Sequence, residues 1–119
     1  MLMVFYYKIF NVERFDVVSL KHDGTKYLIK RVIALPGETI EYKENKLYID
    51  EKYVEEKFLK DVNTTDFGPI TLKDAEYFVL GDNRENSSDS RTYGTFNKSD
   101  FIGKVNLRIW PLNKVKYIK

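Results

Sequence analysis

The sequence has no cysteine and a single histidine, His22. It therefore carries no thiol nucleophile and no disulfide, and it cannot form a Cys/His zinc site. Ser-His-Asp chemistry would depend on His22 alone, and that residue lies in a polar stretch, residues 21–26, that is typical of a solvated loop. We expect no metal, no cofactor and no catalytic role for His22.

Long apolar runs and blocks of like charge are also missing. The longest apolar run, residues 1–7, is far shorter than the ~20 residues that a membrane-spanning helix needs, and nothing resembles a cleavable signal. The formal charge of +2 is spread along the chain, with lysines and acidic residues interleaved in residues 41–46. Because no basic stripe is present, we expect no nucleic-acid partner.

Aromatic residues are plentiful, with nine Tyr and eight Phe, and valine and isoleucine recur in short runs, which favours strands over helices. We predict a mostly β fold, an antiparallel barrel or sandwich with only short helical turns. The predicted strands are residues 5–10, 17–21, 27–35, 39–42, 46–49, 76–80, 104–109 and 114–118. Single helical turns are predicted at residues 72–75 and 98–101, and a hairpin turn at Glu44-Asn45.

Two adjacent cations, Lys30 and Arg31, lie inside the apolar strand 27–35. Strand alternation places them on opposite faces, each beside apolar neighbours, so we expect at least one to be desolvated. Desolvation lowers the pKa of a lysine, and a neutral Lys30 is able to act as a general base. The alternative is an edge strand whose two cations reach water along their aliphatic stems. The strand pattern alone favours this alternative without settling it.

A polar loop, residues 81–91, follows the apolar strand 76–80. It holds three carboxylates, two arginines, two asparagines and three serines. Such a set of donors and acceptors is able to satisfy itself and hold a site rigid, although most polar loops are simply solvated. A buried Arg31 would need carboxylates of this kind as partners.

These two segments resemble a known family. Residues 30–38 resemble the lysine-bearing box of bacterial type I signal peptidases, and residues 81–91 resemble their Gly-Asp-Asn-x-x-x-Ser-x-Asp-Ser-Arg box. Further matches are residues 15–18, 91–94 and 102–105. The resemblance runs from about residue 7 to the end, and the short spacing between the two boxes is similar to the compact Gram-positive members.

The resemblance implies a Ser/Lys dyad, in which a serine attacks the scissile carbonyl and a neutral lysine takes its proton. Lys30 matches that general base, and Ser87 matches the serine that orients it. The residues that match the family's supporting charges are Arg31, Asp82, Asp89 and Arg91. The substrate is expected to add as an extended strand along Tyr27, Leu28 and Ile29, with Ile29 lining a pocket for small side chains.

The resemblance also implies what is cut and where. The substrates would be signal peptides of secretory preproteins with Ala-x-Ala sites. The intact protein would be a membrane-associated serine endopeptidase that acts in protein secretion at the extracytoplasmic face of the cell membrane. Residues 1–119 are expected to form a single extracytoplasmic catalytic domain, soluble by itself.

The sequence departs from the family pattern in two places. Phe15 stands where the family has glycine before Asp16, which requires that this position does not need positive φ. The family's Ser-Met-x-Pro box, which carries the nucleophile, should lie just before residues 4–10 and is absent. The serines of the other matching segments, which do not replace it, are Ser19, Ser87, Ser88 and Ser90. We therefore expect a fragment without its anchor and nucleophile segment, inactive by itself.

Two other function classes stay open. The missing serine box also fits a catalytically inactive signal-peptidase-like protein that binds peptides or partner subunits. A self-cleaving repressor-type Ser/Lys peptidase is the other class, and the long box at residues 81–91 speaks against it.

Overall fold

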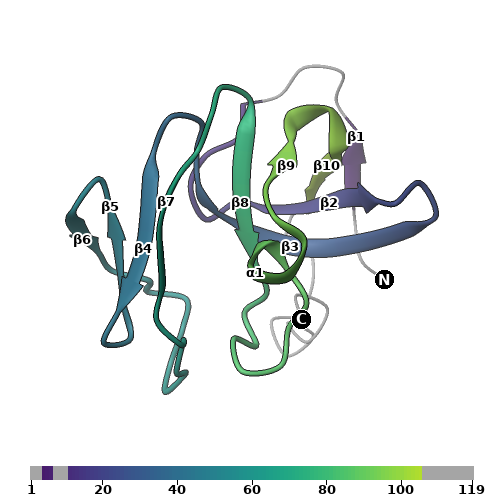
Figure 1. Ribbon diagram of the computed structural model, residues 1–119. Coiled ribbons are helices and arrows are strands. Elements are labelled where there is room, and N and C mark those ends of the chain that lie inside the picture. The colour runs from purple at the N-terminus through teal and green to yellow at the C-terminus, as the bar shows by residue number, and fades with distance from the viewer. Residues whose placement is uncertain (1–3, 7–10, 106–119) are drawn as a thin grey trace.

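The computed structural model describes residues 4–6 and 11–105. This part of the chain forms short strands and two single helical turns (Figure 1). The elements are β1 (Val4–Tyr6), β2 (Val17–His22), β3 (Lys26–Ala34), β4 (Thr39–Lys43), β5 (Lys46–Ile49), β6 (Lys52–Val54), β7 (Phe67–Thr71), β8 (Glu76–Leu80), α1 (Ser90–Tyr93), β9 (Phe96–Asn97), the 3-10 turn η1 (Lys98–Asp100) and β10 (Phe101–Val105).

The strands form two antiparallel sheets. One has the order β1-β10-β2-β3-β8-β9 and the other the order β6-β5-β4-β7. In Figure 1 the four-stranded sheet lies at the left, and β2 and β3 cross the right-hand half. β8 stands upright in the middle of the view. The fold is mostly antiparallel β, as predicted.

Each sheet borders its own hydrophobic core, and β3 and β8 contribute to both. Val32 and Val79 pack in a core with β2, β9 and β10 residues, whereas Ile33 and Phe78 pack in a core with residues of β4 and β5. The cause is strand alternation, which sends successive side chains to opposite faces. The β3–β8 pair is therefore a wall with apolar side chains on both faces.

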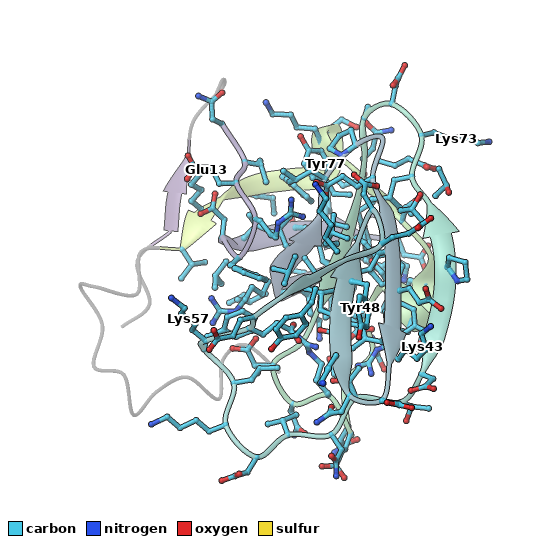
Figure 2. All side chains as sticks on the ribbon, turned by 90° about the vertical axis from the view of Figure 1, so that its left-hand side faces the viewer. Glu13, Lys43, Tyr48, Lys57, Lys73 and Tyr77 are labelled. Atoms are coloured by element: carbon cyan, nitrogen blue, oxygen red, sulfur yellow. The ribbon has the colours of Figure 1, made fainter. Side chains whose placement is uncertain are left out.

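Charged side chains cover the outside of the molecule. Figure 2 shows Lys43, Lys57 and Lys73 at its periphery, and all three are exposed. No helix among the described residues is long and apolar enough to cross a membrane.

Most of the predicted strands inside the described residues are present, with ends that differ by at most one residue. The hairpin turn is also confirmed, since Glu44 and Asn45 have φ values of 52° and 63°, as a two-residue turn of type I′ requires. The 3-10 turn η1 (Lys98–Asp100) confirms the second predicted helical turn.

Other predictions were wrong or fall outside the described residues. Residues 72–75 form a turn instead of a helix, and β10 (Phe101–Val105) begins three residues before the strand predicted at 104–109. Of the predicted strand 5–10 the structure describes only 5–6, and the strand 114–118 lies wholly outside.

Four elements were missed: β6, β7, β9 and α1. β6 and β9 are too short to show an alternating pattern. β7 contains Gly68-Pro69, which indicates a break in a central strand, but β7 is an edge strand, where proline is tolerated. A Cβ on Gly68 would lie 2.6 Å from the carbonyl oxygen of Ile40, so only glycine permits this close approach to β4.

Candidate active site

Lys30 lies in the middle of β3 and is 4% exposed. Its Nζ donates a 3.0 Å hydrogen bond to the hydroxyl of Ser87. Burial lowers the pKa of Lys30 below its ordinary value of 10.5; Asp89 opposes this shift, and Arg91 adds to it. The interpretation of a strand lysine that reaches water is therefore wrong for Lys30. At a given pH a larger fraction of its amine is unprotonated than in an exposed lysine, so it is available as a base.

Ser87 lies in the loop between β8 and α1, and Asp89 holds this loop closed. Asp89 Oδ2 accepts hydrogen bonds from the Gly81 N–H at 3.0 Å and from Arg91 Nη2 at 2.8 Å. Its Oδ1 accepts from Arg91 Nε at 2.9 Å and from the Arg91 N–H at 3.1 Å, which caps α1. Burial by itself would raise the pKa of Asp89, but the hydrogen bonds from Arg91 and Gly81 hold it below its ordinary value of 3.8.

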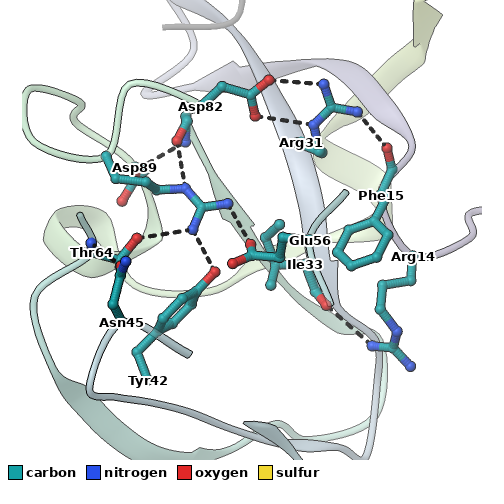
Figure 3. Close-up of polar contacts among 12 residues, drawn as sticks. Arg14, Phe15, Arg31, Ile33, Tyr42, Asn45, Glu56, Thr64, Asp82 and Asp89 are labelled. Carbon is teal, nitrogen blue, oxygen red and sulfur yellow. Dashed lines mark hydrogen bonds and ion pairs between the residues drawn. The ribbon is translucent and has the colours of Figure 1, made fainter. Parts of the chain in front are cut away.

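Arg31 points to the other face of β3 and pairs with Asp82. Arg31 Nε and Nη2 donate to the two oxygens of Asp82 at 3.0 and 2.8 Å (Figure 3). Its Nη1 donates to the carbonyl oxygen of Phe15 at 3.0 Å, and its guanidinium carbon lies 4.1 Å from the centroid of the Phe58 ring. The structure thus brings Arg31 to a loop carboxylate, as expected, and both cations of the strand are buried.

Phe15 has a φ of +74°, so the expectation that this position does not need positive φ is wrong. Its N–H donates to the carbonyl of Val32 at 2.6 Å, and its ring packs edge-on against Phe58 at 4.9 Å. The carbonyl is held by Arg31. These contacts retain a backbone conformation that is unfavourable for a residue with a side chain.

The loop also contains a buried cation that the sequence reasoning missed. The Arg84 side chain has no exposed area, and it contacts Tyr42, Glu56 and Thr64 from outside the loop (Figure 3). An arginine in a polar loop gives no sequence signal that it is buried. The nearest signal is the many polar groups of the loop. They predicted a hydrogen-bonded network but not which residues outside the loop belong to it.

A second missed pair, Arg14 and Glu38, holds the chain after β3. Arg14 donates to both oxygens of Glu38 at 2.7 and 2.6 Å and to the carbonyl of Ile33 at 3.1 Å. Glu38 in turn accepts from the Leu35 N–H at 2.7 Å. The strand that carries the lysine is thereby fixed at its C-terminal end.

The first half of β3 has a backbone edge that β8 does not cover. β8 pairs with β3 only between Arg31 and Ala34, because the chain leaves β8 at Leu80, opposite Arg31. On its other side β3 is paired with β2 along residues 26–31. An extended peptide is able to add to such an edge through its backbone.

The predicted substrate residues lie along this half-strand but on different faces. Leu28 packs against the core of β2 and β9 residues. Tyr27 is 63% exposed and lines a shallow hollow with Ser19 and Ile102, on the face away from Lys30. Ile29 shares the Tyr27 face and is half-buried.

The structure gives the other candidates different surroundings. His22 ends β2 instead of lying in a solvated loop, and its ring lies 4.1 Å from that of Tyr93. Ser88 is exposed, and Ser90 accepts a hydrogen bond from the Val79 N–H at 2.9 Å. Within the described ranges no group of three or more acidic or histidine side chains is placed to hold a metal ion.

Comparisons with known proteins point to one family. The family model described as "Signal peptidase, peptidase S26" matches residues 1–110. Signal peptidase I P of Bacillus subtilis subsp. natto is 42% identical over 90% of this chain and 64% of its own length. Signal peptidase I of Streptococcus pneumoniae serotype 4 is 32% identical over 95% of this chain and 76% of its own length. A crystal structure of a signal peptidase I from Enterococcus faecalis V583 has a TM-score of 0.74 and 33% identity, covering 83% of this chain and all of that one.

The structure is thus that of an antiparallel β protein in which a buried lysine, hydrogen-bonded to a serine, forms a candidate site for proton transfer. The family match then places the chain: it belongs to the signal peptidase family, peptidase S26. The chain spans 64% and 62% of the length of two of the Bacillus subtilis relatives that it matches.

Proposed function

We propose that this chain is the lysine-bearing catalytic part of a signal peptidase I, a serine endopeptidase that removes signal peptides from secretory preproteins. The buried Lys30 amine, 3.0 Å from the Ser87 hydroxyl, is the observation that carries the proposal. Lys30 is the general base, and Ser87 orients it. Arg31, Asp82, Asp89 and Arg91 support the site by pairing with one another.

The proposed reaction begins when a serine hydroxyl attacks the scissile carbonyl carbon and the neutral Lys30 amine takes the hydroxyl proton. As the peptide C–N bond breaks, the Lys30 ammonium gives this proton to the leaving amine. Water then hydrolyses the acyl-enzyme ester with the same amine as base. The attacking serine belongs to the family's Ser-Met-x-Pro box, which these residues do not contain.

The signal peptide is proposed to bind as an extended strand on the open edge of β3, beside Tyr27, Leu28 and Ile29. Support comes from the β8 ladder, which begins only at Arg31. Backbone hydrogen bonds would supply affinity, and shallow pockets near Ile29 would favour the small side chains of Ala-x-Ala sites. In the intact protein this site would work at the extracytoplasmic surface of the cell membrane.

The test compares the 119-residue chain with a longer protein that includes the serine box. The substrate is a fluorogenic peptide with an Ala-x-Ala site, and turnover is measured for both. We expect turnover by the longer protein only, because a base without its nucleophile supplies almost none of the covalent pathway. Lys30→Ala in the longer protein should abolish turnover.

Lys43→Ala, which truncates an exposed lysine at the end of β4, is the matched control and should keep full activity. Full activity of the Lys30→Ala protein would refute the mechanism. Turnover by the 119-residue chain would show instead that the nucleophile lies within it.

A further inference from the structure

We propose that Arg84 is a positioning residue that couples the four-stranded sheet, through Tyr42, to the loop that holds Ser87 on Lys30. The inference rests on the proposed function, because it takes Lys30 as the base. It assigns a role to a sheet that otherwise only packs beside the site.

The Arg84 guanidinium is a charge inside the protein, and its contacts fix its place. The side chain has no exposed area. A buried cation is tolerated only where its donors are hydrogen-bonded and its charge is compensated. Here the compensating charge is Glu56, whose carboxylate accepts from Arg84 Nη2 at 2.7 Å.

The remaining donors of Arg84 join two parts of the fold. Nη1 donates to the Tyr42 hydroxyl of β4 and to Thr64 Oγ1 at 3.3 Å. Nε donates to the carbonyl of Gly81, the first residue of the loop, at 2.8 Å. In Figure 3 the labelled Tyr42, Glu56 and Thr64 lie around one unlabelled guanidinium group, and their hydrogen bonds to Arg84 identify it. One side chain thus ties the start of the loop to the neighbouring sheet.

The backbone of Arg84 carries the link to the other end of the loop. Its carbonyl accepts from Arg91 Nη1 at 2.9 Å, and Arg91 is paired with Asp89. Ser87 lies between Arg84 and Asp89 in the sequence, so both anchors of its segment lead to this arginine. A shift of Arg84 would move the hydroxyl that contacts Lys30.

Tyr42 is the contact that can be removed most cleanly. It is 1% exposed, and burial raises the pKa of its phenol, which keeps it neutral although nearby Arg84 opposes the shift. Its ring packs against Phe67 at 5.1 Å. Tyr42→Phe keeps this packing but leaves a buried Arg84 N–H without its acceptor, a costly state that a shift of the loop would relieve.

The experiment follows the titration of Lys30 itself. Lysines of the 119-residue chain are labelled with ¹³C at Cε, the Lys30 signal is assigned from its absence in Lys30→Ala, and the pKa is measured by NMR. In Tyr42→Phe we expect the pKa of Lys30 to rise toward that of a free lysine, because water reaches the ammonium. Tyr48→Phe removes the hydroxyl of a half-buried tyrosine on β5 of the same four-stranded sheet and should leave the titration unchanged.

A second readout uses the longer protein that carries the serine box. Tyr42→Phe should lower kcat roughly tenfold with little change in KM, because it acts through the placement of the base. Arg84→Lys, which keeps the charge but loses the planar fork, should raise the pKa of Lys30 as well. If Tyr42→Phe does not fold, Thr64→Val removes the other Nη1 acceptor and is read in the same way.

The proposal is overturned if the Lys30 titration in Tyr42→Phe matches that of Tyr48→Phe, since Arg84 would then contribute stability alone. The NMR measurement does not depend on turnover. An inactive longer protein would therefore count against the proposed function while leaving the coupling of Tyr42 to Lys30 standing.

Discussion

Lys30 and Arg31 are neighbours in the sequence, but the fold pairs the charge of Arg31 with a carboxylate and lowers the pKa of Lys30 by burial. Arg31 donates hydrogen bonds to both oxygens of Asp82, and Arg91 pairs with Asp89. The two carboxylates that raise the pKa of Lys30, Asp82 and Asp89, are therefore both paired with guanidinium groups, and burial outweighs their raising effect.

The hydroxyl of Ser87 should matter less for catalysis than the lysine it orients. In the longer protein, Ser87→Ala is expected to reduce kcat/KM by about 10- to 100-fold, whereas Lys30→Ala abolishes turnover. The activity of the parent protein should fall in acid, as pH drops through the lowered pKa of Lys30 and the amine is protonated. Initial rates across pH measure both effects.

Ser88→Ala is the matched control, because Ser88 belongs to the same loop and is exposed. It should behave like the parent protein. Equal losses in Ser87→Ala and Ser88→Ala would mean that the loop is sensitive to any change and that the Ser87 contact has no special role.

Phe15 has a strained backbone conformation, and the contacts of its ring with Phe58 and of its carbonyl with Arg31 offset the cost. We predict that Phe15→Gly is more stable than Phe15→Ala by about 1 kcal/mol, because both lose the ring and only alanine keeps a side chain at a φ of +74°. Urea unfolding of the two variants gives the difference. An alanine variant as stable as the glycine variant would show that this backbone position is not strained.

The loop between β8 and α1 is held by the Asp89 carboxylate as well as by Arg84. α1 has four residues and is too short to be stable by itself, so the hydrogen bonds of Asp89 to Gly81 and Arg91 hold both it and the loop in place. The element that presents Ser87 should therefore depend on the charge of Asp89.

Replacing Asp89 by asparagine should destabilise the protein by about 3 kcal/mol at neutral pH, because Arg91 loses its buried counter-charge. The folded-state pKa of Asp89 lies below its ordinary value of 3.8, so its stabilisation is complete above that value and is lost as pH falls through the lowered pKa. The gap between the parent and Asp89→Asn should narrow in acid. Denaturant unfolding at several pH values measures this gap.

Asp74→Asn, at an exposed position in the turn before β8, is the control and should track the parent at each pH. A gap between the parent and Asp89→Asn that stays constant down to strongly acidic pH would contradict the assignment of Asp89 as the ionised anchor of the loop.

In the described part of the chain two cores share the β3–β8 wall, and the site lies where β3 continues beyond the end of β8. Lys30 faces the core that holds Val32 and Val79, and Arg31 faces the core that holds Ile33 and Phe78. This position makes the four-stranded sheet part of the site's support.

Several features follow from local chemistry and were predicted from the residues alone. Alternating apolar residues place Lys30 and Arg31 on opposite faces of a strand, the Glu44-Asn45 pair makes its hairpin turn, and the polar loop supplies the carboxylate for Arg31. Periodicity and turn preference act over a few neighbouring residues, so they can be read without knowledge of the fold.

The burial of charges was decided only by the tertiary structure. Lys30 and Ser87 are 57 residues apart, and Arg84 and Tyr42 are 42 apart, so neither contact has a local signal. The same holds for the strained Phe15, whose conformation depends on contacts with Val32, Arg31 and Phe58. Desolvation and pairing depend on which distant segments meet, and this determines which lysine has its pKa lowered.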